Sequence, residues 1–278
     1  MKIRIFAIML GALALTAACT KNNNGAAGNA SRSVSQPYTI EVGGSTSVTP
    51  LMELLAEGYH GVKSHIKVNI NGTGSGDGIS NAGKIYQIGM SSRELTPTEQ
   101  GAGLKETVIA IDGIAVIVNA NNPVSNLRIE QIRDIYTGAV TDWAQVSGGT
   151  KSGKIAVVSR EEGSGTRGAF EELVGFQGKL VAGANESTST GAIKAGIVQN
   201  VDAIGYISLG SIDDTIKAIS VEGVAATNSN VTNGSYKIAR PFIILTGSDV
   251  HQESAAFIDW IMSSAGQNIV GKSWIPVK

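Results

Sequence analysis

The chain alternates between two patterns of hydrophobic and polar positions. Residues 66–70 alternate apolar and polar side chains, which is typical of a half-buried strand. Residues 50–59 instead place Leu51, Leu54 and Leu55 on one helical face. Extending this pattern along the chain predicts an α/β fold with mainly parallel strands. The expected strands are 38–42, 66–70, 88–90, 155–158, 203–207 and 215–221. The expected helices are 50–59, 79–85, 127–136, 190–199 and 250–264. Residues 228–235 are expected to form a loop.

Two extended runs are longer than the rest. Residues 108–118 are broken only at Asp112-Gly113, and residues 236–245 only at Pro241. A strand that bends and then continues can pass from one lobe into another. The pattern therefore predicts two α/β lobes joined by two hinge segments, with a cleft between them that suits a small ligand. The first lobe would comprise residues 38–112 plus 239–278, and the second residues 113–238.

The N-terminal segment has the composition of an export signal. Residues 1–18 have a basic start, an apolar middle and a small-residue end, and the apolar part is too short to remain as a membrane-spanning helix. Cys19, the only cysteine, follows at once. It resembles the acylated residue of a bacterial lipoprotein; the alternative is a free thiol after cleavage. Residues 19–37 are polar and small, and we expect a flexible tether. These features predict an extracytoplasmic, lipid-anchored protein in the periplasm or on the cell surface.

Composition narrows the range of partners. Of 278 residues, 42% are hydrophobic and 16% charged, as expected for a compact globular protein. Removal of residues 1–18 takes away Lys2 and Arg4 and leaves 20 basic against 23 acidic residues, a net charge of −3. Without a basic patch, nucleic acid is not expected as a partner. The three histidines are scattered and lack a ligand spacing, so neither a metal nor a cofactor is expected.

The stretch around Arg160 carries the clearest chemistry. A predicted strand leads to Arg160, and a turn of small residues then opens a helix. The start of a helix has free N–H groups and partial positive charge. Ser164 and Thr166 add hydroxyl donors, and Gly165 lets a ligand approach the backbone. Glu162 is close enough to hold the guanidinium. This arrangement suits a small tetrahedral oxyanion.

Three other turns resemble it. Residues 44–47 and 74–77 each follow a strand and open a helix, and Ser91-Ser92 ends a strand. Loops at strand ends lie along one edge of an α/β sheet, where ligands bind. Each turn alone is also explained as an ordinary helix cap. Their occurrence in both lobes favours one shared site.

The order of these turns gives a family resemblance. It is carried by Gly-Ser-Thr-Ser (44–47), Gly-Thr-Gly-Ser-Gly (72–76), Ile-Gly-Met-Ser-Ser-Arg-Glu-Leu (88–95), Ser-Arg-Glu-Glu-Gly-Ser-Gly-Thr (159–166), residues 127–143 and the tail 256–277. Together they resemble the PstS-like phosphate-binding subunit of bacterial phosphate ABC transporters. The resemblance implies the type II fold of periplasmic binding proteins, inorganic phosphate as ligand, no catalysis, a monomer, and membrane permeases with a cytoplasmic ATPase as partners.

The resemblance also implies the site residues. They are Thr46, the N–H of Ser47, Ser75 and Ser92 from the first lobe, and Arg160, Ser164, Gly165 and Thr166 from the second, with Ser45 as a further candidate and Glu162 as the acid beside the arginine. Some members carry Asp where Ser92 stands, and that carboxylate accepts a hydrogen bond from the proton of phosphate and repels fully ionised sulfate. Here either a hydroxyl must do this or Asp77 must take over, and we hypothesise that Asp77 helps.

Three alternatives remain at this stage. The site could bind another oxyanion, such as sulfate or molybdate. The protein could be a phosphate sensor or adhesin that feeds no transporter. A phosphatase is the weakest alternative, because Ser164 has neither a Gly-x-Ser-x-Gly elbow nor a nearby histidine in sequence.

Overall fold

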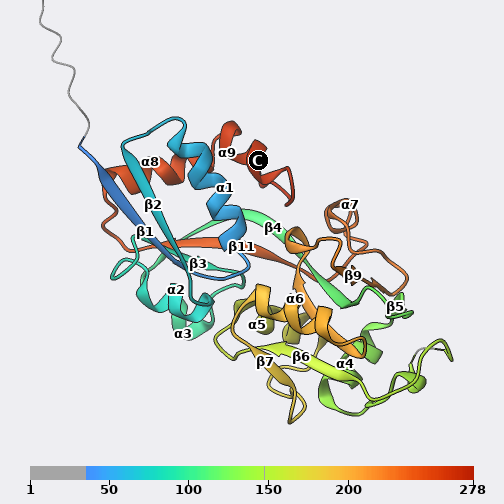
Figure 1. Cartoon of the computed structure of the whole chain (residues 1–278). Coiled ribbons are helices and arrows are strands. Elements are labelled where there is room, and N and C mark those ends of the chain that lie inside the picture. Colours follow the sequence, from blue (N-terminus) through green and yellow to red (C-terminus); the bar gives the residue numbers. More distant parts are fainter. Residues whose placement is uncertain (1–35, 147) are drawn as a thin grey trace, which may run out of the picture. The chain divides into compact units, whose positions relative to one another are not determined.

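The computed structural model describes residues 36–146 and 148–278 (Figure 1). The predicted export signal and Cys19 lie outside this part. Within the described residues, no helix has both the length and the apolar character needed to cross a membrane.

Within the described residues, nine strands form one mixed sheet and two short strands form a second. The large sheet has the order β2-β1-β3-β11-β4-β8-β6-β7, and β9 also pairs with β4. The strands are β1 Tyr38–Gly44, β2 Ile66–Gly72, β3 Ile88–Ser91, β4 Lys105–Asn119, β5 Asn126–Leu127, β6 Ala156–Arg160, β7 Asn185–Ser187, β8 Ala203–Ser208, β9 Ile216–Ala218, β10 Ser220–Val221 and β11 Ala239–Thr246. The expectation of mainly parallel strands is corrected: β11 is antiparallel to β3 and β4, and β4 to β8 and β9. The cause is that β4 carries the chain out of the first lobe and β11 brings it back.

The helices follow the predicted pattern with shifted ends. They are α1 Thr49–His60, α2 Ser75–Asn81, α3 Pro97–Gln100, α4 Ile129–Thr137, α5 Gly165–Val174, α6 Thr190–Gln199, α7 Asn228–Thr232, α8 Gln252–Ile261 and α9 Ser264–Val270, with 3-10 turns η1 Trp143–Gln145 and η2 Leu209–Ser211. Two expectations were wrong. The helix placed at 79–85 begins at Ser75, within the glycine-rich stretch, and stops because Ala82 is extended. The loop placed at 228–235 contains α7, which the Thr227 side chain caps.

Helices cover both faces of the sheet in each half of the molecule. In the first lobe, α1, α8 and α9 contribute to one hydrophobic cluster, and Ile79 of α2 packs on the opposite face with Ile243. In the second lobe, the alternation along β4 sends Ile114 and Val116 toward α4 and α5, whereas Ile117 packs against α6. The prediction of two α/β lobes is thereby confirmed.

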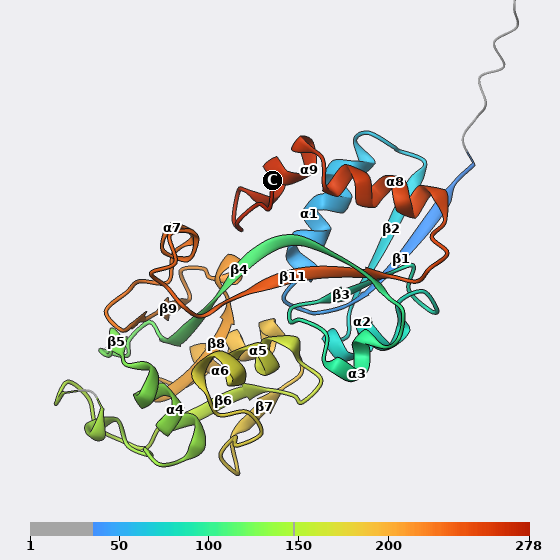
Figure 2. The same ribbon diagram turned by 180° about the vertical axis from the view of Figure 1, so that it is seen from behind.

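The two predicted hinge segments pair with each other. Asp112 of β4 lies opposite Arg240 of β11, and Gly113 lies opposite Ala239. Figures 1 and 2 show β4 and β11 side by side in the first half of the folded chain, and β4 alone continues beside β8 in the second half. The two connections therefore form one hydrogen-bonded ribbon at the crossing between the lobes.

A buried ion pair lies at this crossing. Asp112 accepts a hydrogen bond from Ser208 Oγ at 2.7 Å and pairs with Arg240 Nη2 at 3.2 Å. Burial raises the pKa of Asp112 to about 6, against the lowering effect of Arg240. Ser208 ends β8 in the second lobe, so this carboxylate ties the hinge ribbon to that lobe.

The packing of α2 against the sheet depends on a glycine. A Cβ at Gly78 would lie 2.6 Å from the Met90 carbonyl oxygen and 2.8 Å from Gly44 Cα, both of which are backbone atoms. We predict that Gly78→Ala lowers the free energy of unfolding by about 1–3 kcal/mol, because α2 must move away from β1 and β3. Urea unfolding measures this change.

Gly191 provides the matched control. It lies exposed in α6, and the nearest atom to an added Cβ is Ser189 Oγ at 3.9 Å. Gly191→Ala should raise stability by about 0.5–1 kcal/mol. Equal effects of the two substitutions would contradict the packing described for α2.

Candidate anion-binding site

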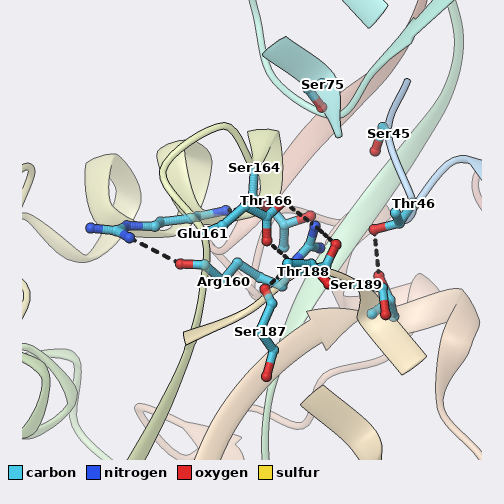
Figure 3. A network of polar contacts seen from close by, with 12 residues as sticks. Ser45, Thr46, Ser75, Arg160, Glu161, Ser164, Thr166, Ser187, Thr188 and Ser189 are labelled. Atoms are coloured by element: carbon cyan, nitrogen blue, oxygen red, sulfur yellow. Dashed lines mark hydrogen bonds and ion pairs between the residues drawn. The ribbon is translucent and has the colours of Figure 1, made fainter. Parts of the chain in front are cut away.

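Arg160 ends strand β6 and is buried, with its side chain 2% exposed. Its Nε donates to Glu161 Oε2 at 2.9 Å and its Nη2 to Glu161 Oε1 at 2.8 Å. The carbonyls of Ser187 and Thr188 accept further bonds from the same guanidinium (Figure 3). Among the described residues, none bonds to Nη1, so this corner of a buried cation is available to an anion.

The main chain around Arg160 is also fixed. Its amide donates to Tyr206 Oη at 3.2 Å, and Ser159 Oγ lies 2.8 Å from the same phenol oxygen. Burial raises the pKa of Tyr206 to about 12, so the phenol stays neutral. Arg167 Nη1 donates to the Arg160 carbonyl at 3.0 Å and also pairs with Glu186. These contacts anchor the end of β6.

Helix α5 begins directly after this strand. Ser164 is its N-cap, and the Ser164 hydroxyl accepts from the Arg167 amide at 3.3 Å. The first amides of α5, at Gly165 and Thr166, precede the positions that have intrahelical partners. Ser164 is 3% exposed and Thr166 1%. A buried helix N-terminus is thus placed beside a buried guanidinium, and both favour a negatively charged ligand.

The first lobe contributes a compact group of hydroxyls. Ser45 Oγ donates to Ser92 Oγ at 2.9 Å, and Ser75 Oγ lies 3.3 Å from the same atom. The Ser92 amide donates to Ser75 Oγ at 3.1 Å. All three side chains are at most 3% exposed. Three separate strand ends therefore place their hydroxyls at one point.

Hydrogen bonds connect this group to the second lobe. Ser47 Oγ lies 2.7 Å from Thr166 Oγ1, and Ser92 Oγ lies 3.4 Å from it. The Gly76 amide donates to the Gly163 carbonyl at 3.0 Å. The two lobes are therefore in contact at their hydroxyl-bearing loops.

Gly165 makes this close approach possible. A Cβ at this position would lie 2.3 Å from Ser75 Oγ and 2.9 Å from Ser92 Oγ. Only a residue without a side chain allows the start of α5 to meet the first-lobe hydroxyls.

The residues expected from sequence are largely brought together. Hydrogen bonds join Ser45, Ser47, Ser75, Ser92 and Thr166 in one network. At its edge lie Arg160 at the end of β6, the N-cap Ser164 and Gly165 at the start of α5. Figure 3 shows Ser45, Thr46 and Ser75 on one side and the Arg160–Thr166 segment on the other. Thr46 reaches this region through Thr190, whose Oγ1 is 3.4 Å away.

The expectation that Glu162 holds Arg160 was wrong. The carboxylate that holds Arg160 belongs to Glu161, whereas Glu162 is exposed. The Ser164 amide bonds to the Glu161 carbonyl, and the chain turns there, so the second acid is carried outward.

Asp77 is engaged elsewhere. Its oxygens accept from Thr73 Oγ1, from Tyr86 Oη at 2.9 Å and from Asn81 Nδ2 at 2.8 Å. The bond from Thr73 is the main cause that lowers the pKa of Asp77. Its carboxylate is thus tied to neighbours in residues 73–86, and within the described residues it makes no hydrogen bond to the first-lobe hydroxyls.

Two residues with contacts in this region were not predicted from the sequence. For the partner of Arg160, the sequence analysis chose Glu162 instead of Glu161. Thr190, which begins α6, was expected only as part of a helix, yet it is 7% exposed and lies 3.1 Å from Ser47 Oγ. A polar residue at a helix start was the available signal, but many helix starts share it.

The described residues contain no group of three or more His, Cys, Asp or Glu side chains that could hold a metal ion. The site instead offers hydroxyls, amides and one cation. Each hydroxyl can both donate and accept. Such a set can surround a small oxyanion with donors and can also accept a hydrogen bond from a protonated oxygen of that anion.

Comparison with known proteins agrees with this chemistry. Residues 24–265 match the family model for the PBP superfamily domain. The phosphate-binding protein PstS of Borreliella burgdorferi is 31% identical over 246 residues, which cover 83% of this chain and 87% of that protein. The chain belongs to the PstS-like phosphate-binding proteins of the PBP superfamily.

Solved structures of this family extend the comparison. A substrate-binding protein from Clostridium perfringens, assigned to a phosphate ABC transporter and crystallised with bound phosphate, is 47% identical with a TM-score of 0.84. It covers 87% of this chain and 100% of its own. An ABC-type phosphate transport receptor from Vibrio cholerae is 36% identical with a TM-score of 0.71, covering 86% and 100%. These relatives are named as binding or transport proteins rather than enzymes, which disfavours a phosphatase.

The two neighbouring acids can be separated by stability measurements. We predict that Glu161→Gln lowers the free energy of unfolding by about 1–3 kcal/mol, because the buried Arg160 loses its charged partner. Glu162→Gln, at an exposed position, should stay within about 0.5 kcal/mol of the parent protein. Denaturant unfolding at pH 7 gives both values, and a larger loss for Glu162→Gln would contradict the contact described for Arg160.

Proposed function

We propose that this protein binds inorganic phosphate between its two lobes, outside the cytoplasm, and delivers it to an ABC importer. The observation that carries the proposal is the meeting of a buried guanidinium, a helix N-terminus and hydroxyls from three first-lobe loops. The family membership and the phosphate-bound relative from Clostridium perfringens support it. Release of phosphate to membrane permeases would follow opening of the lobes.

The ligand residues of the proposal come from both lobes. Thr46, Ser47, Ser75 and Ser92 would bind from residues 38–112 plus 239–278, and Ser45 would assist. Arg160, Ser164, Gly165 and Thr166 would bind from residues 113–238. The paired hinge strands β4 and β11 support this division. A tetrahedral dianion suits the set, because donors surround it from several directions and Arg160 compensates its charge.

The anchoring and the assembly state belong to the same proposal. An export signal would direct the protein across a membrane before its removal, an acylated Cys19 would then anchor it at the outer side, and residues 19–37 would serve as a tether for the folded part. A monomer is sufficient, because one chain supplies both sides of the site.

The direct test is isothermal titration of the protein with phosphate, sulfate and molybdate. We expect phosphate to bind one to one with a dissociation constant of about 1 μM or tighter, corresponding to roughly −8 kcal/mol. Tighter binding of sulfate would favour the alternative oxyanion function. The specific reason to test it is Ser92, because a hydroxyl does not repel sulfate as a carboxylate at this position would. Absence of binding by all three anions would refute the proposal.

Arg160 is the residue on which the binding energy depends most. Arg160→Ala should weaken phosphate binding by about 2–5 kcal/mol, since a buried charge pairing is lost. Arg133→Ala is the matched control, because Arg133 pairs with Asp134 at an exposed position, 43% accessible, and the net charge changes equally. Similar affinities of the two variants in the same titration would argue against Arg160 as a ligand residue.

Selectivity gives a separate prediction. Because the Asp77 carboxylate is bonded to Thr73, Asn81 and Tyr86, Asp77→Asn should leave the ratio of phosphate to sulfate affinity unchanged within about threefold. Competition titrations measure the ratio. A much lower ratio of phosphate to sulfate affinity in Asp77→Asn would support Asp77 as the acceptor of a hydrogen bond from the phosphate proton.

A further inference from the structure

Among the described residues, Thr190 is the one second-lobe side chain outside α5 that is hydrogen-bonded to the first-lobe hydroxyls. Its Oγ1 lies 3.1 Å from Ser47 Oγ and 3.4 Å from Thr46 Oγ1. It is the first residue of α6 and is 7% exposed. Figure 3 shows the bond that connects Thr46 to the segment after Ser189.

The backbone holds Thr190 in a fixed relation to Arg160. Strand β7 pairs in parallel with β6, and Ser187 lies opposite Arg160 in this register. The carbonyls of Ser187 and Thr188 accept hydrogen bonds from the Arg160 guanidinium. Two residues later the Ser189 side chain caps α6 by accepting from the Ala192 amide at 3.1 Å. The segment that orients Arg160 therefore also places the Thr190 hydroxyl.

The hydrogen bonds of Ser47 indicate the role of the Thr190 hydroxyl. Ser47 Oγ lies within bonding distance of both Thr166 Oγ1, at 2.7 Å, and Thr190 Oγ1, at 3.1 Å. A serine hydroxyl has a single proton to donate. If Thr190 donates to Ser47, the Ser47 proton is directed away from α6 and toward the site. Loss of Thr190 would leave Thr166 as the second-lobe hydroxyl bonded to Ser47 and would remove the contact that directs the Ser47 proton.

We propose that Thr190 is a positioning residue for phosphate binding, which fixes the Thr46–Ser47 turn against the second lobe when the lobes are closed. The inference deepens the proposed function and rests on it. Thr190 acts through Ser47 and Thr46, and its hydroxyl stabilises the closed, ligand-holding form. Phosphate should therefore leave faster when this hydroxyl is absent.

The test replaces the hydroxyl by a methyl group of similar size. Phosphate affinity and dissociation rate are measured for Thr190→Val, with Thr98→Val as a control, since Thr98 is exposed in α3 and its side chain makes no hydrogen bond within the described residues. We expect Thr190→Val to bind phosphate about 3- to 12-fold more weakly, the worth of one or two hydrogen bonds, with the change mainly in dissociation. Thr190→Ser keeps the hydroxyl, so its phosphate affinity should lie within about twofold of that of the parent protein. The same is expected of the control Thr98→Val.

A double-mutant cycle distinguishes positioning from a general loss of packing. Ser47→Ala is measured alone and together with Thr190→Val. If Thr190 acts through Ser47, the double variant loses less affinity than the product of the two single losses. Multiplicative losses, or a Thr190→Val affinity within about twofold of the parent, would overturn the inference.

Measuring phosphate binding by the parent protein distinguishes failure of this inference from failure of the proposed function. Failure of the parent to bind phosphate would refute the proposed function itself. Normal binding by the parent with an unaffected Thr190→Val variant would refute only the role of Thr190. Circular dichroism of each ligand-free variant verifies that it is folded before its affinity is compared.

Discussion

The whole arrangement depends on burying one guanidinium. Arg160 has its side chain 2% exposed, and removing such a charge from water is costly unless it is paired and hydrogen-bonded. Glu161 and two carbonyls meet most of this requirement and leave Nη1 unbonded within the described chain. In the proposed function an oxyanion would supply the remaining partner, so the same feature that costs stability would produce affinity for anions.

The rest of the fold can be understood as support for this residue. Strand β7 orients the guanidinium through the Ser187 carbonyl, and Tyr206 fixes the Arg160 amide. The α5 N-terminus adds its dipole beside the charge. The paired strands β4 and β11 let the first lobe approach this site as a unit, with Asp112 and Arg240 buried at the crossing. Hinge and site are therefore parts of one continuous sheet.

The sequence could predict features that depend on local pattern. The strand–turn–helix after Arg160 and the two long hinge runs follow from hydrophobic periodicity and glycine placement, and the structure has both. It could not predict which of two adjacent acids holds Arg160, because the turn at Glu161 decides where each side chain points. The role of Thr190 could not be predicted for another reason. Its contacts with Thr46 and Ser47 depend on the pairing of β7 with β6, which is a tertiary feature without a local sequence signal.

The most direct measurement is a crystal structure of the folded part, residues 36–278, grown with phosphate. The account predicts a single phosphate ion within hydrogen-bond distance of Arg160 and the first α5 amides in one lobe, and of Thr46, the Ser47 amide, Ser75 and Ser92 in the other. A phosphate that contacts only one lobe, or that lies away from Arg160, would contradict it.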